Sequence, residues 1–88
     1  MTLAPLPYYE ASIDVMQEIV QAVNNWPPMN SQHEAFAVLM EEVDELWDCV
    51  RIKQKNRDLA KARNEAIQVA ATAIRFAVEV CTEERGRK

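Results

Sequence analysis

Residues 31–50 read SQHEAFAVLMEEVDELWDCV, and this stretch has the pattern of an amphipathic helix. Ser31 and Glu34 form a capping-box pattern, in which the hydroxyl and the carboxylate satisfy exposed backbone donors at the start of a helix. Apolar residues then recur on one side at about 100° per residue; they are Phe36, Leu39, Val43, Leu46, Trp47 and Val50. The stretch therefore predicts an amphipathic helix that runs from residue 31 to about Gln54.

A second helix is expected before this one. Its apolar residues follow one another at spacings of four and three, and they are Tyr9, Ile13, Met16, Val20 and Val23. Pro7 suits a first helical turn, because that turn has no use for the missing backbone N–H. Trp26-Pro27-Pro28 ends the pattern, so this helix is expected to stop at about Asn24.

A third helix is expected to begin at a cap supplied by Asn56 or Asp58 and to continue to about Glu84, before Gly86. It is apolar around most of its circumference, with a ladder of small residues beside larger ones: Ala66, Ala70, Ala73 and Ala77, then Ile67, Ile74, Val78 and Cys81. Two other helices cannot cover such a surface. The sequence thus predicts an all-α fold of three helices per chain that forms a four-helix-type bundle in a homodimer or a dimer of dimers.

The length of 88 residues predicts one domain, residues 1–88, whose core is too small to make a monomer very stable. No run of apolar residues is long enough to span a bilayer, and the N-terminus lacks the basic region of a signal peptide. We therefore expect a cytoplasmic protein without a membrane partner. Cys49 and Cys81 fit no metal-binding spacing and are expected to be small core residues.

The charges divide the chain into two halves. Residues 1–50 hold nine acidic and no basic residues, whereas residues 51–88 hold ten basic and five acidic residues. The acidic half disfavours nucleic acid as a partner, and an acidic cluster beside a basic segment suits a site that holds cations and phosphates together. The alternative is that the charges only make the helices soluble.

Residues 41–48 carry five carboxylates in eight positions and no basic residue. Like charges three and four residues apart repel one another on a helix, and a bound cation would relieve this repulsion. Glu42 and Glu45 share a stripe with Val38, Cys49 and Ile52, whereas Glu41 and Asp48 are expected farther towards solvent. Glu65 is also expected to be partly covered, with Gln68 one turn later on the same side. The alternative is a solvated face, or salt bridges to Lys61, Arg63 or Arg75.

The segment Glu41-Glu42-Val43-Asp44-Glu45, followed after nineteen residues by Glu65-Ala66-Ile67-Gln68, resembles the E-E-x-x-E … E-x-x-D motif of the MazG-like all-α nucleoside triphosphate pyrophosphohydrolases. The resemblance covers roughly residues 31–82. It implies a hydrolase that binds Mg²⁺, with Mn²⁺ as an alternative, and splits a nucleoside triphosphate into a monophosphate and pyrophosphate. By position, the metal ligands would be Glu42, Glu45, Glu65 and Gln68, and the catalytic residues Glu41 and Glu42. Gln68 departs from the motif, which has aspartate there.

Other residues have weaker roles in this interpretation. Lys53 and Lys61, near the turn between the second and third helices, are candidates for contact with substrate phosphates. Trp26 is expected to pack over the end of the first helix, with stacking on a nucleobase as the alternative. Glu79 is expected to matter little to the site. The competing function is that of a non-catalytic helical oligomer that binds a nucleotide or a protein partner.

Overall fold

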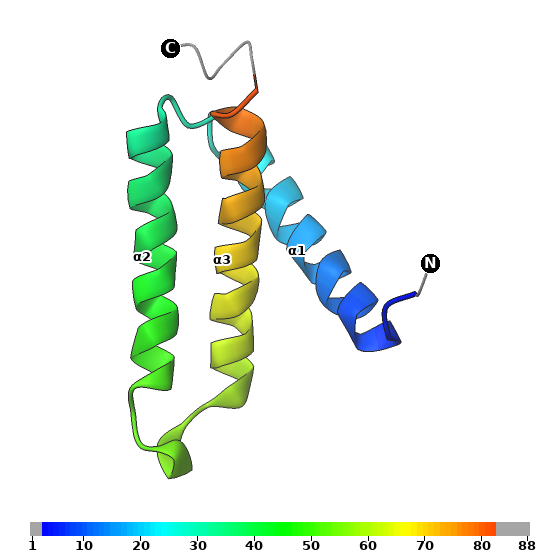
Figure 1. Cartoon of the computed structure of the whole chain (residues 1–88), viewed down its shortest axis with the longest axis vertical. Coiled ribbons are helices and arrows are strands. Elements are labelled where there is room, and N and C mark those ends of the chain that lie inside the picture. Colours follow the sequence, from blue (N-terminus) through cyan, green and yellow to red (C-terminus); the bar gives the residue numbers. More distant parts are fainter. Residues whose placement is uncertain (1–2, 83–88) are drawn as a thin grey trace.

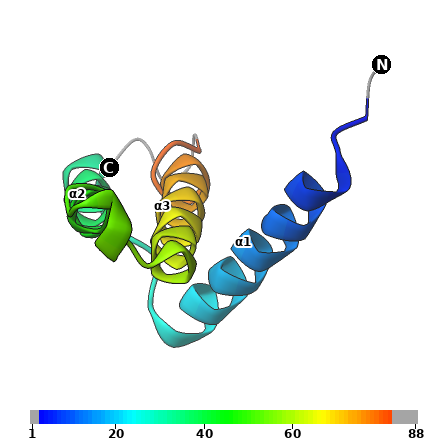
Figure 2. The same cartoon turned by 90° about the horizontal axis from the view of Figure 1, so that it is seen from below.

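The computed structural model describes residues 3–82, and within that range the chain is helical with no strand. The elements are α1 (Leu6–Asn25), α2 (Gln32–Val50), the short 3-10 helix η1 (Gln54–Asn56) and α3 (Leu59–Glu79). α2 and α3 run antiparallel and side by side, and α1 lies against α3 at an angle (Figures 1 and 2). The predicted all-α fold with three α-helices is confirmed for the described residues. None of the helices in that range has the length and apolar character needed to cross a membrane.

The starts of α2 and α3 follow the predicted capping chemistry. The Ser31 hydroxyl accepts a hydrogen bond from the backbone N–H of Glu34 at 3.1 Å. The Glu34 carboxylate accepts from the backbone N–H of Asn30 at 3.4 Å, so it does not complete the reciprocal half of the box. Of the two caps expected for α3, Asp58 is used, because its carboxylate accepts from the backbone N–H of Lys61 at 3.1 Å. These side chains satisfy donors that the helices leave open.

The predicted ends of both helices were too late. α2 ends at Val50 and not at Gln54, since the residues that follow it are exposed and no packing stabilises a further turn. α3 ends at Glu79, well before the expected end at Glu84. There Val80 leaves the helical conformation and is 1% exposed. Position 84 itself lies outside the described residues.

The core consists of two small clusters. Between α1 and α3, Val15 packs with Ile67 and Ala71. At the other end of α3, Val80 packs with Met29 and Ala35, next to Val38 and Phe76. These clusters fix α1 and α2 on different sides of α3 and leave the space between α1 and α2 open.

Much apolar surface stays outside these clusters. α1 turns Ala11, Val15 and Ile19 towards α3, so its predicted stripe is exposed, with Ile13 57% and Val20 55% accessible. Exposure of the same kind is found on the other two helices: Phe36, Met40, Trp47 and Val50 on α2, and Ile74 and Val78 on α3. Cys49 is buried as expected, but Cys81 is exposed. A single chain thus leaves uncovered much of the surface that its sequence pattern marks as apolar.

Candidate functional site

Three carboxylates from two helices meet on the side where α2 faces α3. Glu42 and Glu45 on α2 and Glu65 on α3 each place an oxygen within 4.8 Å of the others. Glu42 and Glu65 are half-buried, and Glu45 is exposed. The periodicity of the sequence predicted that these three residues would lie close together. The antiparallel pairing of α2 and α3 brings them to the same place. We call this group the carboxylate triad.

The triad is electrostatically crowded. Burial, followed by the charges of Glu45 and Glu65, raises the pKa of Glu42 above its ordinary value of 4.5. Burial, followed by the nearby carboxylate of Glu45, likewise raises the pKa of Glu65, against a smaller opposing effect of Lys61. One carboxylate oxygen of Glu65, Oε2, is buried and has no hydrogen-bond partner in the described part of the chain. A buried acceptor without a partner is costly, so this oxygen lies where a bound ligand would satisfy it.

The alternative of salt bridges to the triad is not supported by the ion pairs within residues 3–82. There Arg63 pairs with Asp14 on α1 at 2.8 Å. Arg75 pairs with Glu79 at 2.8 Å, and Arg51 pairs with Asp48 at 3.0 Å. None of these contacts involves the triad, so its like charges are not neutralised by an ion pair within the described range.

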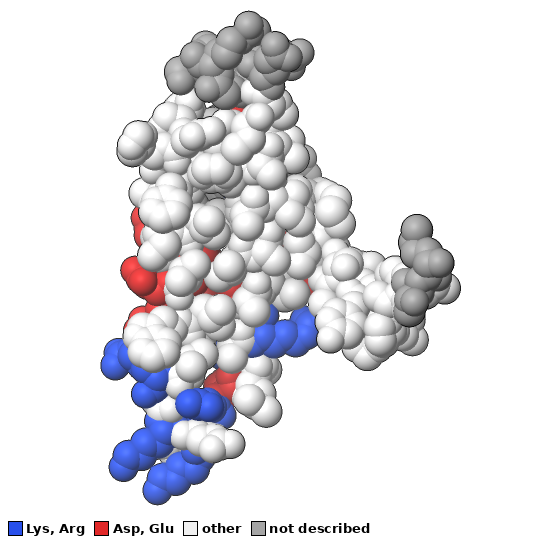
Figure 3. Space-filling view, viewed as in Figure 1, with Lys and Arg blue, Asp and Glu red and all other residues white. Residues whose placement is uncertain are grey.

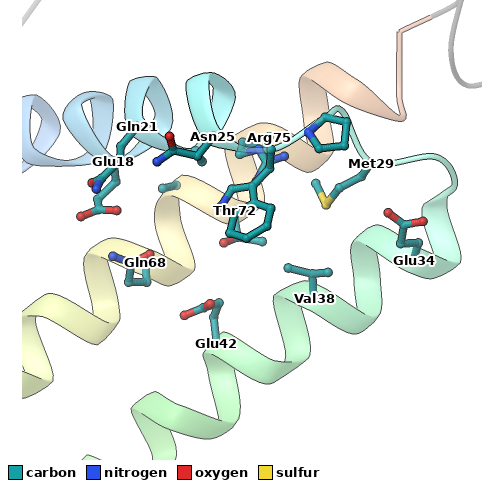
Figure 4. A pocket seen from close by; sticks show the side chains of 14 residues that line it. Glu18, Gln21, Asn25, Met29, Glu34, Val38, Glu42, Gln68, Thr72 and Arg75 are labelled. Carbon is teal, nitrogen blue, oxygen red and sulfur yellow. The ribbon is translucent and has the colours of Figure 1, made fainter.

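A cleft of about 760 Å³ opens beside the triad, and Glu42 belongs to both. All three helices line it: Gln21 and Asn25 on α1, Val38 and Glu42 on α2, and Gln68 and Thr72 on α3 (Figure 4). Sequence reasoning did not predict this cleft, because it depends on the angle at which α1 leaves the other two helices. It brings the predicted residue Gln68 and the triad member Glu42 to the same end of one space (Figure 4).

The remaining predicted catalytic residue, Glu41, is exposed on α2. Its negative charge contributes to the raised pKa of Glu42. Glu41 does not line the cleft. The structure therefore places it on the solvent side of the triad, as the helical periodicity predicted.

The predicted phosphate contacts lie at the end of the molecule where α2 connects to α3. Lys53 precedes η1 and Lys61 stands in the first turn of α3, and both are exposed. Figure 3 shows basic side chains gathered at this lower end, with acidic side chains above them. Lys61 is one helical turn from Glu65, whereas neither lysine lines the cleft.

Glu79 makes contacts that the sequence did not predict, and Trp26 is more exposed than expected. Glu79 is only 9% exposed; it accepts a hydrogen bond from the Met29 backbone N–H at 2.8 Å and binds Arg75 through two nitrogens. It thus holds a residue of the cleft wall in place, and the i,i+4 spacing from Arg75 was the signal that sequence reasoning missed. Trp26 is 67% exposed and lines the cleft, so it does not pack over the end of α1. Trp47, which belongs to the predicted apolar side of α2, is 57% exposed in the single chain.

Oxygen-rich sites of this kind suit hard divalent cations, because carboxylates are the ligands that such cations prefer. The donor set of the triad and the buried, unpartnered Oε2 of Glu65 both fit this chemistry. No family model, curated protein or solved structure matches the chain.

Proposed function

We propose that the chain is a Mg²⁺-dependent nucleoside triphosphate pyrophosphohydrolase, the activity implied by its resemblance to the MazG-like family. One observation carries the proposal. Glu42, Glu45 and Glu65 converge from two helices within 4.8 Å, with an oxygen of Glu65 buried and unpartnered within the described residues. Phosphoryl transfer needs no nucleophilic side chain, because it depends chiefly on positioning and charge stabilisation.

In this proposal Glu42, Glu45 and Glu65 hold the cation, and Gln68 supplies a neutral oxygen or a supporting hydrogen bond beside Glu42. When bound, Mg²⁺ supplies positive charge to the oxygens of the triphosphate. Glu41, at the solvent side of the triad, orients the attacking water and accepts its proton, with Glu42 as its neighbour. The water oxygen would bond to the α phosphorus while the bond from that phosphorus to the oxygen bridging to the β phosphate breaks, so that a nucleoside monophosphate and pyrophosphate leave. Lys53 and Lys61 are placed to contact outer phosphate oxygens.

Pyrophosphate release from a panel of nucleoside triphosphates, with Mg²⁺ and with chelator, tests the activity. We expect release that requires Mg²⁺ or Mn²⁺ and that Glu45→Gln abolishes. Asp44→Asn is the matched control, because it removes an exposed charge next to Glu45 that is not part of the triad. Equal release by wild type and Glu45→Gln would exclude the triad as the catalytic site.

We also propose that the chain forms a homodimer or a dimer of dimers. On α1 the polar residues that line the cleft, Glu18, Gln21 and Asn25, lie on a different face from the exposed apolar row that contains Ile13 and Val20. A second copy covering that row, together with the apolar side chains of α2, would bury surface that one chain leaves in water. Light scattering at micromolar concentration is expected to give a multiple of the chain mass, and Ile13→Glu is expected to lower it. A folded wild-type monomer would contradict this proposal.

The exposed apolar surface equally favours the second candidate function, a non-catalytic helical oligomer that binds a nucleotide or a protein. The two candidates differ in turnover. Metal-dependent nucleotide binding without pyrophosphate release from any triphosphate of the panel would favour the binding protein.

A further inference from the structure

α1 contributes nothing to the carboxylate triad, yet it builds one wall of the cleft that begins at Glu42. Glu18, Gln21 and Asn25 follow one another at helical spacings of three and four, so they project from the same face of α1. None of these three side chains forms a hydrogen bond or an ion pair within residues 3–82. α1 therefore presents a row of unused polar groups to the cleft (Figure 4).

The shape of the cleft follows from the angle of α1. α1 packs on α3 and diverges from α2, so α3 forms the floor between two walls (Figure 2). Figure 4 places Glu18, Gln68 and Glu42 at one end of this space and Met29 and Glu34 at the other. Along the floor, the seven-residue step from Gln68 to Arg75 corresponds to about 10 Å of helix.

The charges of the cleft differ from those of a phosphate site. Among the described residues that line it, Arg75 is the one cation, and both its Nε and one terminal nitrogen bind Glu79. At the end of the cleft away from the triad, Glu34 adds negative charge and the positive charge of Arg75 is already paired with Glu79. That end thus suits the uncharged part of a substrate and repels its phosphates.

We propose that α1 binds the nucleoside of the substrate in this cleft, so that α1 selects nucleotides over inorganic polyphosphates. This inference rests on the proposed function, since it assumes that the phosphates lie at the triad. Glu18, at the triad end, accepts hydrogen bonds from hydroxyls of the pentose. Farther along, the base stacks on Trp26, and Gln21 and Asn25 reach its edge with amides that both donate and accept hydrogen bonds.

Two ligands separate the nucleoside from the phosphates. An α,β-imido nucleoside triphosphate carries both parts and is not cleaved between its α and β phosphates, whereas inorganic triphosphate carries only the phosphates. Their dissociation constants are measured by calorimetry at saturating Mg²⁺ for the wild type and for Trp26→Ala and Asn25→Ala. Gln17→Ala is the matched control, because Gln17 is an amide on the other face of α1. All three positions are exposed, and circular dichroism checks that the variants stay helical.

We expect Trp26→Ala to weaken nucleotide binding about tenfold, the effect of one lost base stack, and to leave inorganic triphosphate unchanged. Asn25→Ala should act in the same direction and Gln17→Ala should have no effect. Any of three results would overturn the inference: the wild type does not bind the nucleotide, neither cleft variant loses affinity for the nucleotide, or the variants lose affinity equally for the nucleotide and for inorganic triphosphate. Selective loss of nucleotide binding without pyrophosphate release would support it while removing the enzymatic function. If the wild type releases pyrophosphate but the variants bind the nucleotide as well as it does, the enzymatic function would stand and the inference about α1 would fall.

Discussion

Replacing Glu42 with glutamine should stabilise the metal-free protein and destabilise the protein in Mg²⁺, each relative to the wild type. In the metal-free chain, the Glu42 carboxylate lies within 4.8 Å of oxygens of Glu45 and Glu65, and burial and these charges raise its pKa. The amide of glutamine has nearly the same shape but no charge. The substitution thus removes two repulsions and the cost of burying a charge, and it also removes one anionic ligand from the proposed metal site.

The structure gives the size of the repulsion, and the linkage relation gives the size of the Mg²⁺ effect at a chosen excess over Kd. Two unit charges separated by 4.8 Å repel by about 0.9 kcal/mol at the dielectric constant of water and by about 3.5 kcal/mol at an effective value near 20. Because Glu45 is exposed, the lower value applies to its pair, and we expect a gain of about 1 to 2 kcal/mol in chelator. That gain corresponds to a rise in Tm of about 4 to 16 °C for a domain of this size. Mg²⁺ at a hundredfold excess over its Kd would stabilise the wild type by about 2.7 kcal/mol, or about 10 to 20 °C.

Thermal unfolding followed by circular dichroism at neutral pH, in chelator and in millimolar Mg²⁺, measures both effects. The order of melting temperatures should reverse between the two conditions. Asp44→Asn, which removes a neighbouring charge outside the triad, should keep the full gain from Mg²⁺. The reasoning is refuted if Glu42→Gln melts below the wild type in chelator or gains as much from Mg²⁺ as the wild type does.

Three further predictions concern the same region. In chelator, the Tm of the wild type should fall as the pH rises from 4.5 through the raised pKa values of Glu42 and Glu65, because the native state holds protons that the unfolded state has released. A pH series should show a smaller fall in Tm for Glu42→Gln. An equal fall in the variant and the wild type would show that Glu42 is not its source. Glu79→Ala should lower the free energy of unfolding, measured by urea denaturation, by about 3 to 5 kcal/mol, since it leaves the Arg75 guanidinium buried without its partner. The control Glu10→Ala, on the surface of α1, should change this free energy little. A loss for Glu79→Ala as small as that of the control would show that the pair contributes little to stability. Gln68→Asp should tighten Mg²⁺ binding in a metal titration and raise turnover, and Glu45→Gln should do the opposite; unchanged affinity in both would mean that α2 and α3 share no metal site.

The features of the fold that depend only on residues close in sequence, such as the starts of α2 and α3, could be predicted from the sequence. The Ser31 and Asp58 caps act within one turn of chain, and the hydroxyl or carboxylate that makes each cap is visible in the sequence. The end of α3 could not be predicted in this way. Val80 leaves the helix where it packs against Met29 and Ala35, residues that are distant in sequence and close only in the folded chain.

The same distinction applies to the candidate site. Glu42 and Glu45 share a helical face, and their meeting with Glu65 needs only that two consecutive helices lie antiparallel. The cleft could not be predicted from helical periodicity alone, because its formation depends on which side of α1 faces α3. The sequence marks the large apolar row of α1, but the structure packs Ala11 and Val15 against α3 and turns the larger residues outwards. Only the tertiary arrangement therefore places Trp26 and Asn25 in the cleft.

The distribution of arginines gives a physical reason to place a cation at the triad. Arg51, Arg63 and Arg75 each pair with a carboxylate outside it, and two of these pairs lie largely on the surface, where they stabilise the fold little. The three carboxylates that meet between α2 and α3 are joined to no arginine or lysine by an ion pair within residues 3–82, although burial and mutual repulsion raise the pKa of two of them, Glu42 and Glu65. A fold that only needed soluble helices would be more stable with an amide at Glu42 or Glu65, because each carboxyl is partly buried and has a raised pKa. The divalent cation that we propose for the triad would reverse that balance, since it would convert the repulsion among the three carboxylates into shared attraction and give the buried Oε2 of Glu65 a partner.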